Sequence, residues 1–155
     1  MALKEPTIQP AGELRFVGLG QFIRFQDMQK IVGQWERFMS EFYPTINDRL
    51  AEPPVGITMQ MKEDGVEYFC AAGVSKFGAT PEGCTNLILK PATYAVFAHD
   101  GNVSQVPKTY SEIWNDWLPK SGKVPARAPG FERHNETFDR RTGNGGVTIW
   151  LPIET

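Results

Sequence analysis

Apolar residues recur at helical intervals in two stretches of the chain. The first runs from Met28 to residue 42, where Asp27 can act as N-cap and Pro44 ends the pattern. The second begins between residues 106 and 109 and ends at the Trp-Leu-Pro sequence 117–119, because proline disfavours helical geometry in the residue before it. Thr109 and Glu112 have the spacing of a capping box. The pattern therefore predicts two main helices.

Period-two alternation and β-branched or aromatic residues predict strands on either side of each helix. Strands are expected over residues 13–19, 87–98, 131–138 and 147–153, with a hairpin over 55–74. Residues 1–12 read as an extended lead-in, 76–85 as a crossover and 140–146 as a hairpin tip. The order strand, helix, strand, strand thus occurs twice, over residues 13–74 and 87–153. The predicted fold class is α+β, with two β-α-β-β modules in one domain.

The Asp64-Gly65 pair predicts the turn and register of the first hairpin. A two-residue type I′ turn at this pair aligns apolar residues on one face of both strands and places a charge pair beside the turn. The expected partners are Met61 with Tyr68, Met59 with Cys70, Ile57 with Ala72, and Lys62 with Glu67.

Composition excludes several classes of function. The chain has 155 residues and a formal net charge of −2, so it lacks the basic stripe expected of a direct nucleic-acid partner. It has no apolar run of signal-peptide or bilayer-spanning length, which predicts a cytoplasmic location and no membrane partner. Cys70 and Cys84 are expected to be reduced. The histidines and cysteines lack metal-ligand spacing, so neither a metal nor a cofactor is expected.

The last strand predicts two different faces. Val147, Ile149, Leu151 and Ile153 alternate with Thr148 and Trp150, and the aliphatic set should face the helices. Trp150 then points to the opposite face, where either the other module or a ligand must bury it. By contrast, Trp35 and Trp114 have helical positions that are typical of a core.

Short motifs spread along the chain resemble the GyrI-like effector-binding family, which also occurs at the C-terminus of AraC-type and MerR-type multidrug-responsive regulators. The motifs are Ala72-Gly73-Val74, Tyr94-Ala95-Val96-Phe97 with His99 and Gly101, Thr109-Tyr110, Trp117-Leu118-Pro119 with Ser121-Gly122, Pro129 with Phe131-Glu132, and Ile149-Trp150-Leu151-Pro152-Ile153. Together they extend from about residue 14 to residue 153. The resemblance implies an antiparallel sheet with two main helices, pseudo-two-fold symmetry, and a ligand cleft between the modules.

The resemblance also implies a set of binding residues. Glu132 matches a cleft carboxylate of the family and Trp150 matches an aromatic of the ligand wall, so both are expected on one wall. Thr148 stands beside Trp150 where many relatives have Glu, and His134 stands where they often have Tyr. His134 is either a partner of Glu132 or a surface imidazole, and Glu132 itself could be a solvated surface residue. The further expected contributors are Tyr94 and Tyr68.

The residues and the resemblance together lead to three hypotheses about function. The leading one is a stand-alone effector-binding domain over residues 1–155 that captures an amphipathic aromatic, in some cases cationic, small molecule and is linked to transcription regulation or toxin resistance. No sequence is left for a helix-turn-helix, so regulation would need a separate partner. The first alternative is a hydrolase of strained cyclopropane-bearing toxins with Glu132 as acid or base. The second is a protein-binding, gyrase-inhibitor-like role, and self-association into a homodimer stays open.

Overall fold

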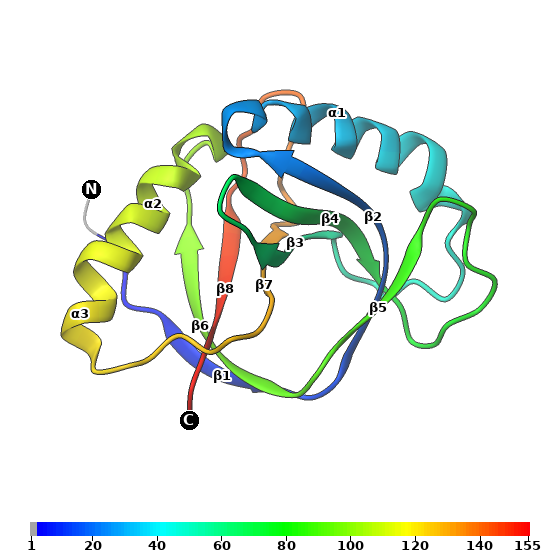
Figure 1. Cartoon of the computed structure of the whole chain (residues 1–155). Helices are drawn as coiled ribbons and strands as arrows, with labels where there is room; N and C mark the ends of the chain where they lie inside the picture. The colour runs from blue at the N-terminus through cyan, green and yellow to red at the C-terminus, as the bar shows by residue number, and fades with distance from the viewer. Residues whose placement is uncertain (1–2) are drawn as a thin grey trace.

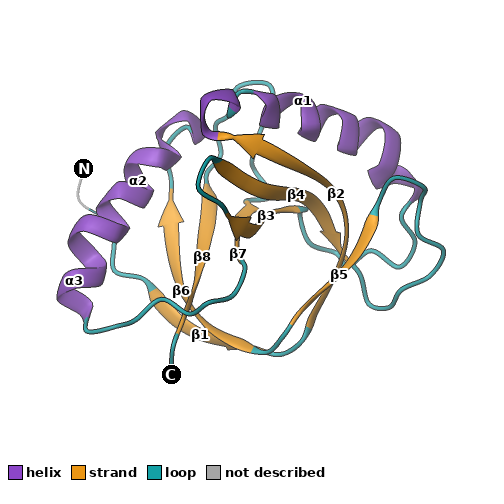
Figure 2. Cartoon of the chain, viewed as in Figure 1, coloured by secondary structure: helices purple, strands orange, loops and turns teal. Residues whose placement is uncertain are grey.

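Eight strands, two main helices and several short helical turns make up the described part of the protein, residues 3–155 of a computed structural model (Figure 1, Figure 2). The strands are β1 (Thr7–Ala11), β2 (Leu14–Arg24), β3 (Val55–Met61), β4 (Gly65–Gly73), β5 (Thr85–Leu89), β6 (Ala92–His99), β7 (Gly130–His134) and β8 (Val147–Ile153). The helices are α1 (Lys30–Arg37), α2 (Val106–Glu112) and α3 (Leu118–Ser121), and α3 continues the course of α2.

All strands belong to one antiparallel sheet in the order β1-β6-β8-β7-β3-β4-β2-β5. The module β2-α1-β3-β4 supplies the neighbours β2, β4 and β3, and the module β6-α2-β7-β8 supplies β6, β8 and β7. The two triplets meet where Val55 of β3 pairs with Arg133 of β7 and Thr58 pairs with Gly130. This order confirms the predicted α+β fold of two β-α-β-β modules.

The two edges of the sheet meet. The edge strand β1 runs on into β2, which lies next to the opposite edge, and the edge strand β5 runs on into β6, which lies next to β1. Ala11 of β1 pairs with Ala92 of β6, and Leu14 of β2 pairs with Leu89 of β5. Two residues separate these positions on both chain segments, so the register is unbroken. The segments β1-β2 and β5-β6 therefore form one long ladder, along the lower side of Figure 1, that closes the sheet into a barrel-like ring.

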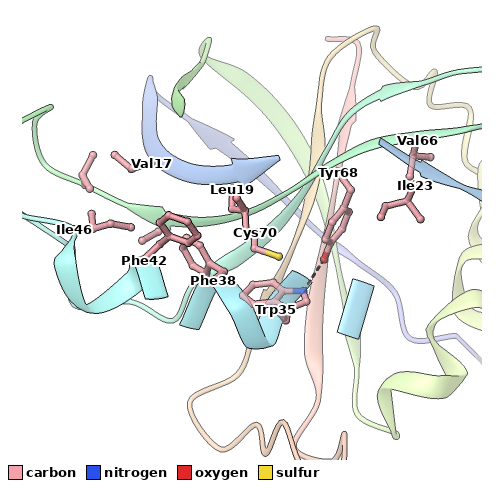
Figure 3. Close-up of a cluster of buried hydrophobic side chains, with 12 residues drawn as sticks. Val17, Leu19, Ile23, Trp35, Phe38, Phe42, Ile46, Val66, Tyr68 and Cys70 are labelled. Carbon is pink, nitrogen blue, oxygen red and sulfur yellow. Dashed lines mark hydrogen bonds between the residues drawn. The ribbon is translucent and has the colours of Figure 1, made fainter. Parts of the chain in front are cut away.

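Three apolar cores result, one inside the ring and one under each helix. The inner core is built from both modules and contains Phe16, Val55, Ile57, Phe69, Ala71, Leu87, Leu89, Tyr94, Val96 and Phe131. Helix α1 packs on the outer face of β2 and β4 (Figure 3), and α2 packs with α3 on the outer face of β6 and β8. Because successive residues of a strand face opposite sides, a single strand contributes to an inner and an outer core.

The strand boundaries depart from the sequence prediction at four places. The strand expected over residues 13–19 extends to Arg24 as β2. The described part of the lead-in contains β1, which pairs with β6. The strand expected over residues 87–98 is interrupted at Lys90-Pro91 and forms β5 and β6, which pair with different strands. β7 ends at His134, four residues early, because Phe138 N–H donates to Asn135 O in a turn. β8 has the predicted bounds.

The register expected for the first hairpin is wrong. Lys62 N–H donates to Gly65 O at 2.8 Å, so the turn consists of residues 63–64 and lies one position earlier than predicted. Met61 pairs with Val66, and a bulge between Thr58 and Gln60 shifts the register again. The glycine is needed for a different reason: a Cβ at position 65 would come within 2.9 Å of Arg24 Cα on β2. As a result of the shifted register, Met61 is exposed and does not share the apolar face with Ile57.

The first helix begins slightly later than predicted and ends as predicted. Asp27 lies in a 3-10 turn (Phe25–Asp27) and makes no cap, and α1 starts without a side-chain cap at Gln29. The helix then widens into a π-helical turn (Phe38–Phe42) and ends in a 3-10 turn that contains Pro44.

The second helix passes through the proline that was expected to end it. A π-helical turn (Ile113–Trp117) follows α2, and Leu118 N–H donates to Ile113 O, five residues back. This wider turn changes the hydrogen-bond spacing at the position where Pro119 has no N–H to donate. The chain leaves the helix at Gly122, whose φ of 73° is left-handed.

The capping box expected at Thr109 is also wrong, because α2 begins at Val106 and Thr109 lies inside it. Its hydroxyl instead lies 2.7 Å from His99 Nδ1. The cap is provided earlier by Asn102, whose Oδ1 accepts from Ser104 N–H.

Candidate ligand site between the two helices

The carboxyl group of Glu132 lies on the outer face of β7, between residues from both modules. Phe131 faces the inner core, so the next residue faces the helices. On the neighbouring strands, Glu132 pairs with Gly56 of β3 and Ile149 of β8. The residue as a whole is partly buried, and its carboxyl group is surrounded by protein atoms. It is not a solvated surface residue.

Both helices contribute a side chain to this position. Tyr110 of α2 donates its hydroxyl proton to Glu132 Oε2 at 2.9 Å. Trp35 of α1 donates its indole N–H to the Tyr68 hydroxyl at 3.0 Å, the contact drawn as a dashed line in Figure 3. The electrostatic influence of Glu132 raises the pKa of Tyr68 in addition to burial, which indicates that the two groups are near one another. The site is therefore lined by Glu132, Tyr110, Tyr68 and Trp35.

Glu132 lacks a cationic partner. Among the described residues none forms an ion pair with its carboxylate. Burial raises its pKa above the ordinary range, while the Tyr110 hydrogen bond and the charge of His99 act in the opposite direction. Burial and the same carboxylate raise the pKa of Tyr110. The site therefore combines a desolvated carboxyl group with hydroxyls that hold their protons.

His134 lies beside the site and is a buried residue, not the surface imidazole considered above. Its ring is 4.8 Å from the Trp35 ring and stacks on Phe138 at 4.3 Å. Burial and the nearby charge of Arg140 lower its pKa to about 4, and its Nδ1 has no hydrogen-bond partner in the described part of the protein. Within residues 3–155, His134 makes no hydrogen bond to Glu132. Its neutral imidazole instead packs against the Trp35 ring, at the edge of the site.

Gly56 makes room for the tyrosine hydroxyl of this site. A Cβ at position 56 would overlap Tyr68 Oη and lie 2.9 Å from Tyr68 Cζ. Nothing in the sequence indicated the role of Gly56. Tyr110 occurs in the Thr109-Tyr110 motif, but the motif did not indicate a contact with Glu132. Trp35 was expected in the core, and it both packs there and donates to the site.

Trp150 and Glu132 do not lie on a common wall, which corrects the expectation drawn from the resemblance. The Trp150 ring stacks on Phe131 at 5.1 Å and meets Tyr94 at 5.6 Å, inside the ring of strands. Since Phe131 and Glu132 are adjacent in one strand, their side chains face opposite sides of the sheet. Trp150 is thus partly buried, by these aromatics and by residues of the other module in the inner core.

Thr148 does lie beside Trp150, as expected, and accepts a hydrogen bond from its indole N–H at 3.0 Å. The guanidinium of Arg133 lies over the same indole, 5.4 Å from the ring centroid, and its NH2 is 3.3 Å from Glu52. Trp114 was expected in the core and is 48 % exposed.

Two hollows on the surface lie away from Glu132. One, of about 660 Å³, separates the N-terminal segment from α2 and α3, and the other, of about 480 Å³, runs between β2 and α1. Glu132 lines neither of these two hollows, in agreement with the burial of its carboxyl group.

The sequence matches the model of the GyrI-like small molecule binding domain over residues 4–154. The chain belongs to this family. A comparison with curated proteins finds no match. No helix within residues 3–155 has the length and apolar character needed to cross a bilayer.

Solved structures share the fold of this GyrI-like domain at low sequence identity. The structure of SAV2435 bound to tetraphenylphosphonium has a TM-score of 0.76 and 19% identity, over 97% of this chain and 94% of that one. A putative bacterial transcription regulation protein from Staphylococcus aureus MU50 has a TM-score of 0.72 and 22% identity, over 97% and 99%. EcmrR in complex with DNA has a TM-score of 0.71 and 11% identity, over 97% of this chain and 57% of that one.

Proposed function

We propose that this GyrI-like domain binds an amphipathic aromatic cation at Glu132, in a cleft that opens when α1 and α2 separate. The observation that carries the proposal is a carboxyl group enclosed by protein atoms without a cationic partner among the described residues. An ionised carboxylate at such a place is costly unless it is paired. A cationic ligand supplies the missing charge.

The residues around Glu132 suit a delocalised organic cation. Trp35, Tyr68 and Tyr110 contribute aromatic rings, and a cation near such a ring gains about 0.5–2 kcal/mol, more when water is excluded. Tyr68 and His134 thus belong to the proposed site. Tyr94, Thr148 and Trp150 support the sheet behind it from the inner core.

Ligand binding at this carboxyl group is coupled to proton release. Without a ligand, burial raises the pKa of Glu132, and a nearby cation lowers it. The titratable groups facing the carboxyl group are the hydroxyls of Tyr110 and Tyr68 and the imidazole of His99. Affinity for a cation therefore increases as pH rises toward the raised pKa and levels off above it.

The likeness to SAV2435, which binds tetraphenylphosphonium, and to transcription regulators supports this role. We infer that the protein either senses a lipophilic compound for transcription regulation or sequesters it in toxin resistance.

Calorimetric titration with tetraphenylphosphonium tests the proposal. Glu132→Gln removes the charge at nearly constant volume and should weaken binding by about tenfold or more, since truncating a buried charge interaction costs a few kcal/mol. Triphenylphosphine oxide, a neutral aromatic of similar shape, should bind both forms alike. Glu136→Gln is the matched control, because Glu136 is an exposed acid close by on the same segment. Equal cation affinity of the wild type and Glu132→Gln contradicts the proposal.

A second proposal is hydrolysis of a strained cyclopropane-bearing compound. It is favoured by the Tyr110–Glu132 hydrogen bond, because a buried carboxyl group whose pKa is raised holds its proton more readily and can donate it to a substrate. Turnover that is lost in Glu132→Gln supports it, whereas stoichiometric binding without product supports a binding protein.

A further inference from the structure

We propose that Arg140 determines how strongly the Glu132 site prefers cationic over neutral ligands. Its guanidinium lies on the Trp35 ring, which forms the aromatic wall of the site, and a cationic ligand must displace it from there. The inference rests on the proposed function and adds a specificity-determining residue to it.

Arg140 approaches the site through Trp35. Its guanidinium carbon lies 5.4 Å from the centroid of the Trp35 ring, within the range of a cation-π contact. The indole N–H of Trp35 also donates a hydrogen bond to the Tyr68 hydroxyl. Burial and the nearby carboxylate of Glu132 raise the pKa of Tyr68. Trp35 is therefore shared by the arginine and by the wall of the ligand site.

The arginine and the carboxyl group are both without an opposite charge in direct contact. Arg140 forms no ion pair within residues 3–155, although the next residue, Arg141, lies 3.7 Å from Asp139. Arg140 is exposed as a whole residue, yet partial burial lowers the pKa of its guanidinium. Burial and, after it, the charge of Arg140 lower the pKa of His134. A positive charge thus already acts on the aromatic wall that a cationic ligand would use.

The position of Arg140 is fixed by the loop between β7 and β8. Asn102, just before α2, donates from its side-chain amide to Thr142 O at 2.8 Å and to the Asn144 side chain at 2.9 Å. Val103 N–H donates to Gly143 O at 2.8 Å. The same loop stacks Phe138 on His134. These contacts hold the loop against the 3-10 turn (Val103–Gln105) that leads into α2, while Arg140 reaches Trp35 of α1, so the loop connects the two helical segments beside the site.

Such an arrangement penalises cations and leaves neutral ligands unaffected by charge. A cation that enters must either displace the guanidinium from Trp35 or accept its repulsion across the same ring. Arg140→Gln keeps a polar side chain and removes the charge. It should tighten tetraphenylphosphonium binding roughly three- to tenfold, the equivalent of one cation-π contact, and leave triphenylphosphine oxide within about twofold.

Arg141→Gln is the matched control, because it removes the same charge from the same loop at a side chain that is 92% exposed. Calorimetry on the wild type and both variants should show the gain for Arg140→Gln alone. Equal gains in both variants would indicate a general charge effect, and no gain or weaker binding in Arg140→Gln would overturn the proposal. Cation binding that is absent, or insensitive to Glu132→Gln, in the wild type would instead refute the proposed function itself.

A measurement without ligand provides an independent check. If Arg140 lies on this wall, Arg140→Gln should raise the pKa of His134 from about 4, as followed by NMR titration of the imidazole, and Arg141→Gln should not. An unchanged His134 titration would show that the guanidinium does not occupy the wall.

Discussion

Gly56→Ala should destabilise the protein through Tyr68 specifically. The added methyl group would overlap Tyr68 Oη and lie 2.9 Å from Cζ, while the phenol packs in the core beneath α1. The ring must therefore move, and the hydrogen bond from Trp35 to the hydroxyl is lost. Gly56 has no left-handed φ, so the backbone itself accepts alanine.

The magnitude follows from three contributions. Forcing a methyl group into a packed core costs about 1–3 kcal/mol, and losing the Trp35–Tyr68 hydrogen bond costs about 1 kcal/mol. Replacing glycine by alanine returns about 0.4–1 kcal/mol through the unfolded chain. The net loss of unfolding free energy should be about 1–3.5 kcal/mol.

A double-mutant cycle with Tyr68→Phe isolates the cause. Tyr68→Phe removes the hydroxyl that the methyl group meets, so Gly56→Ala should cost less in that background, by about 1 kcal/mol or more. Urea denaturation of the four proteins gives the coupling energy. Additive costs, within about 0.5 kcal/mol, would show that the alanine does not act on Tyr68, and the described site geometry would be wrong.

Three further predictions use other groups of the molecule. Because burial raises the pKa of Glu132, the folded state keeps a proton that the unfolded chain releases; unfolding free energy is therefore lost as pH rises from the ordinary value to the raised one. Glu132→Gln should gain stability relative to the wild type over that interval in urea titrations, and a constant difference would contradict this. Trp35→Ala should cost about 3–5 kcal/mol, whereas Trp114→Ala, half exposed, should cost under about 1 kcal/mol in the same assay; similar costs would refute the burial pattern. Burial raises the pKa of the Cys70 thiol more than that of Cys84, so a thiol reagent should modify Cys84 first, and faster labelling of Cys70 would contradict it.

Helical periodicity and strand alternation located the main elements, because each reports which side of an element meets a core. The aliphatic residues of β8 face α2, and Trp150 faces the inner core, as alternation predicts. The resemblance predicted Glu132 as a ligand-binding residue, and the structure places its carboxyl group next to the Tyr110 hydroxyl. The same alternation, applied to Phe131 and Glu132, would have separated Glu132 from Trp150, because Phe131 and Trp150 are the stacked pair.

Contacts between distant segments could not be predicted. Gly65 serves the close approach of β2 rather than the turn, and the pairing of β1 with β6 depends on closure of the ring. Pro119 is accommodated by a π-helical turn that local sequence does not signal. Tyr110 reaches Glu132 of β7 only because α2 packs on the outer face of the neighbouring strands β6 and β8, so its role emerged from the structure.

The position of a bound cation tests the central claim most directly. A crystal structure of the protein with tetraphenylphosphonium should show the phosphorus closer to the Glu132 carboxylate than to any other acidic group, with phenyl rings against Trp35 and Tyr110 and α1 separated from α2. A cation held instead in the hollow beside Trp117, which Glu5, Glu112 and Asp116 also line, or no bound cation at all, would contradict the account.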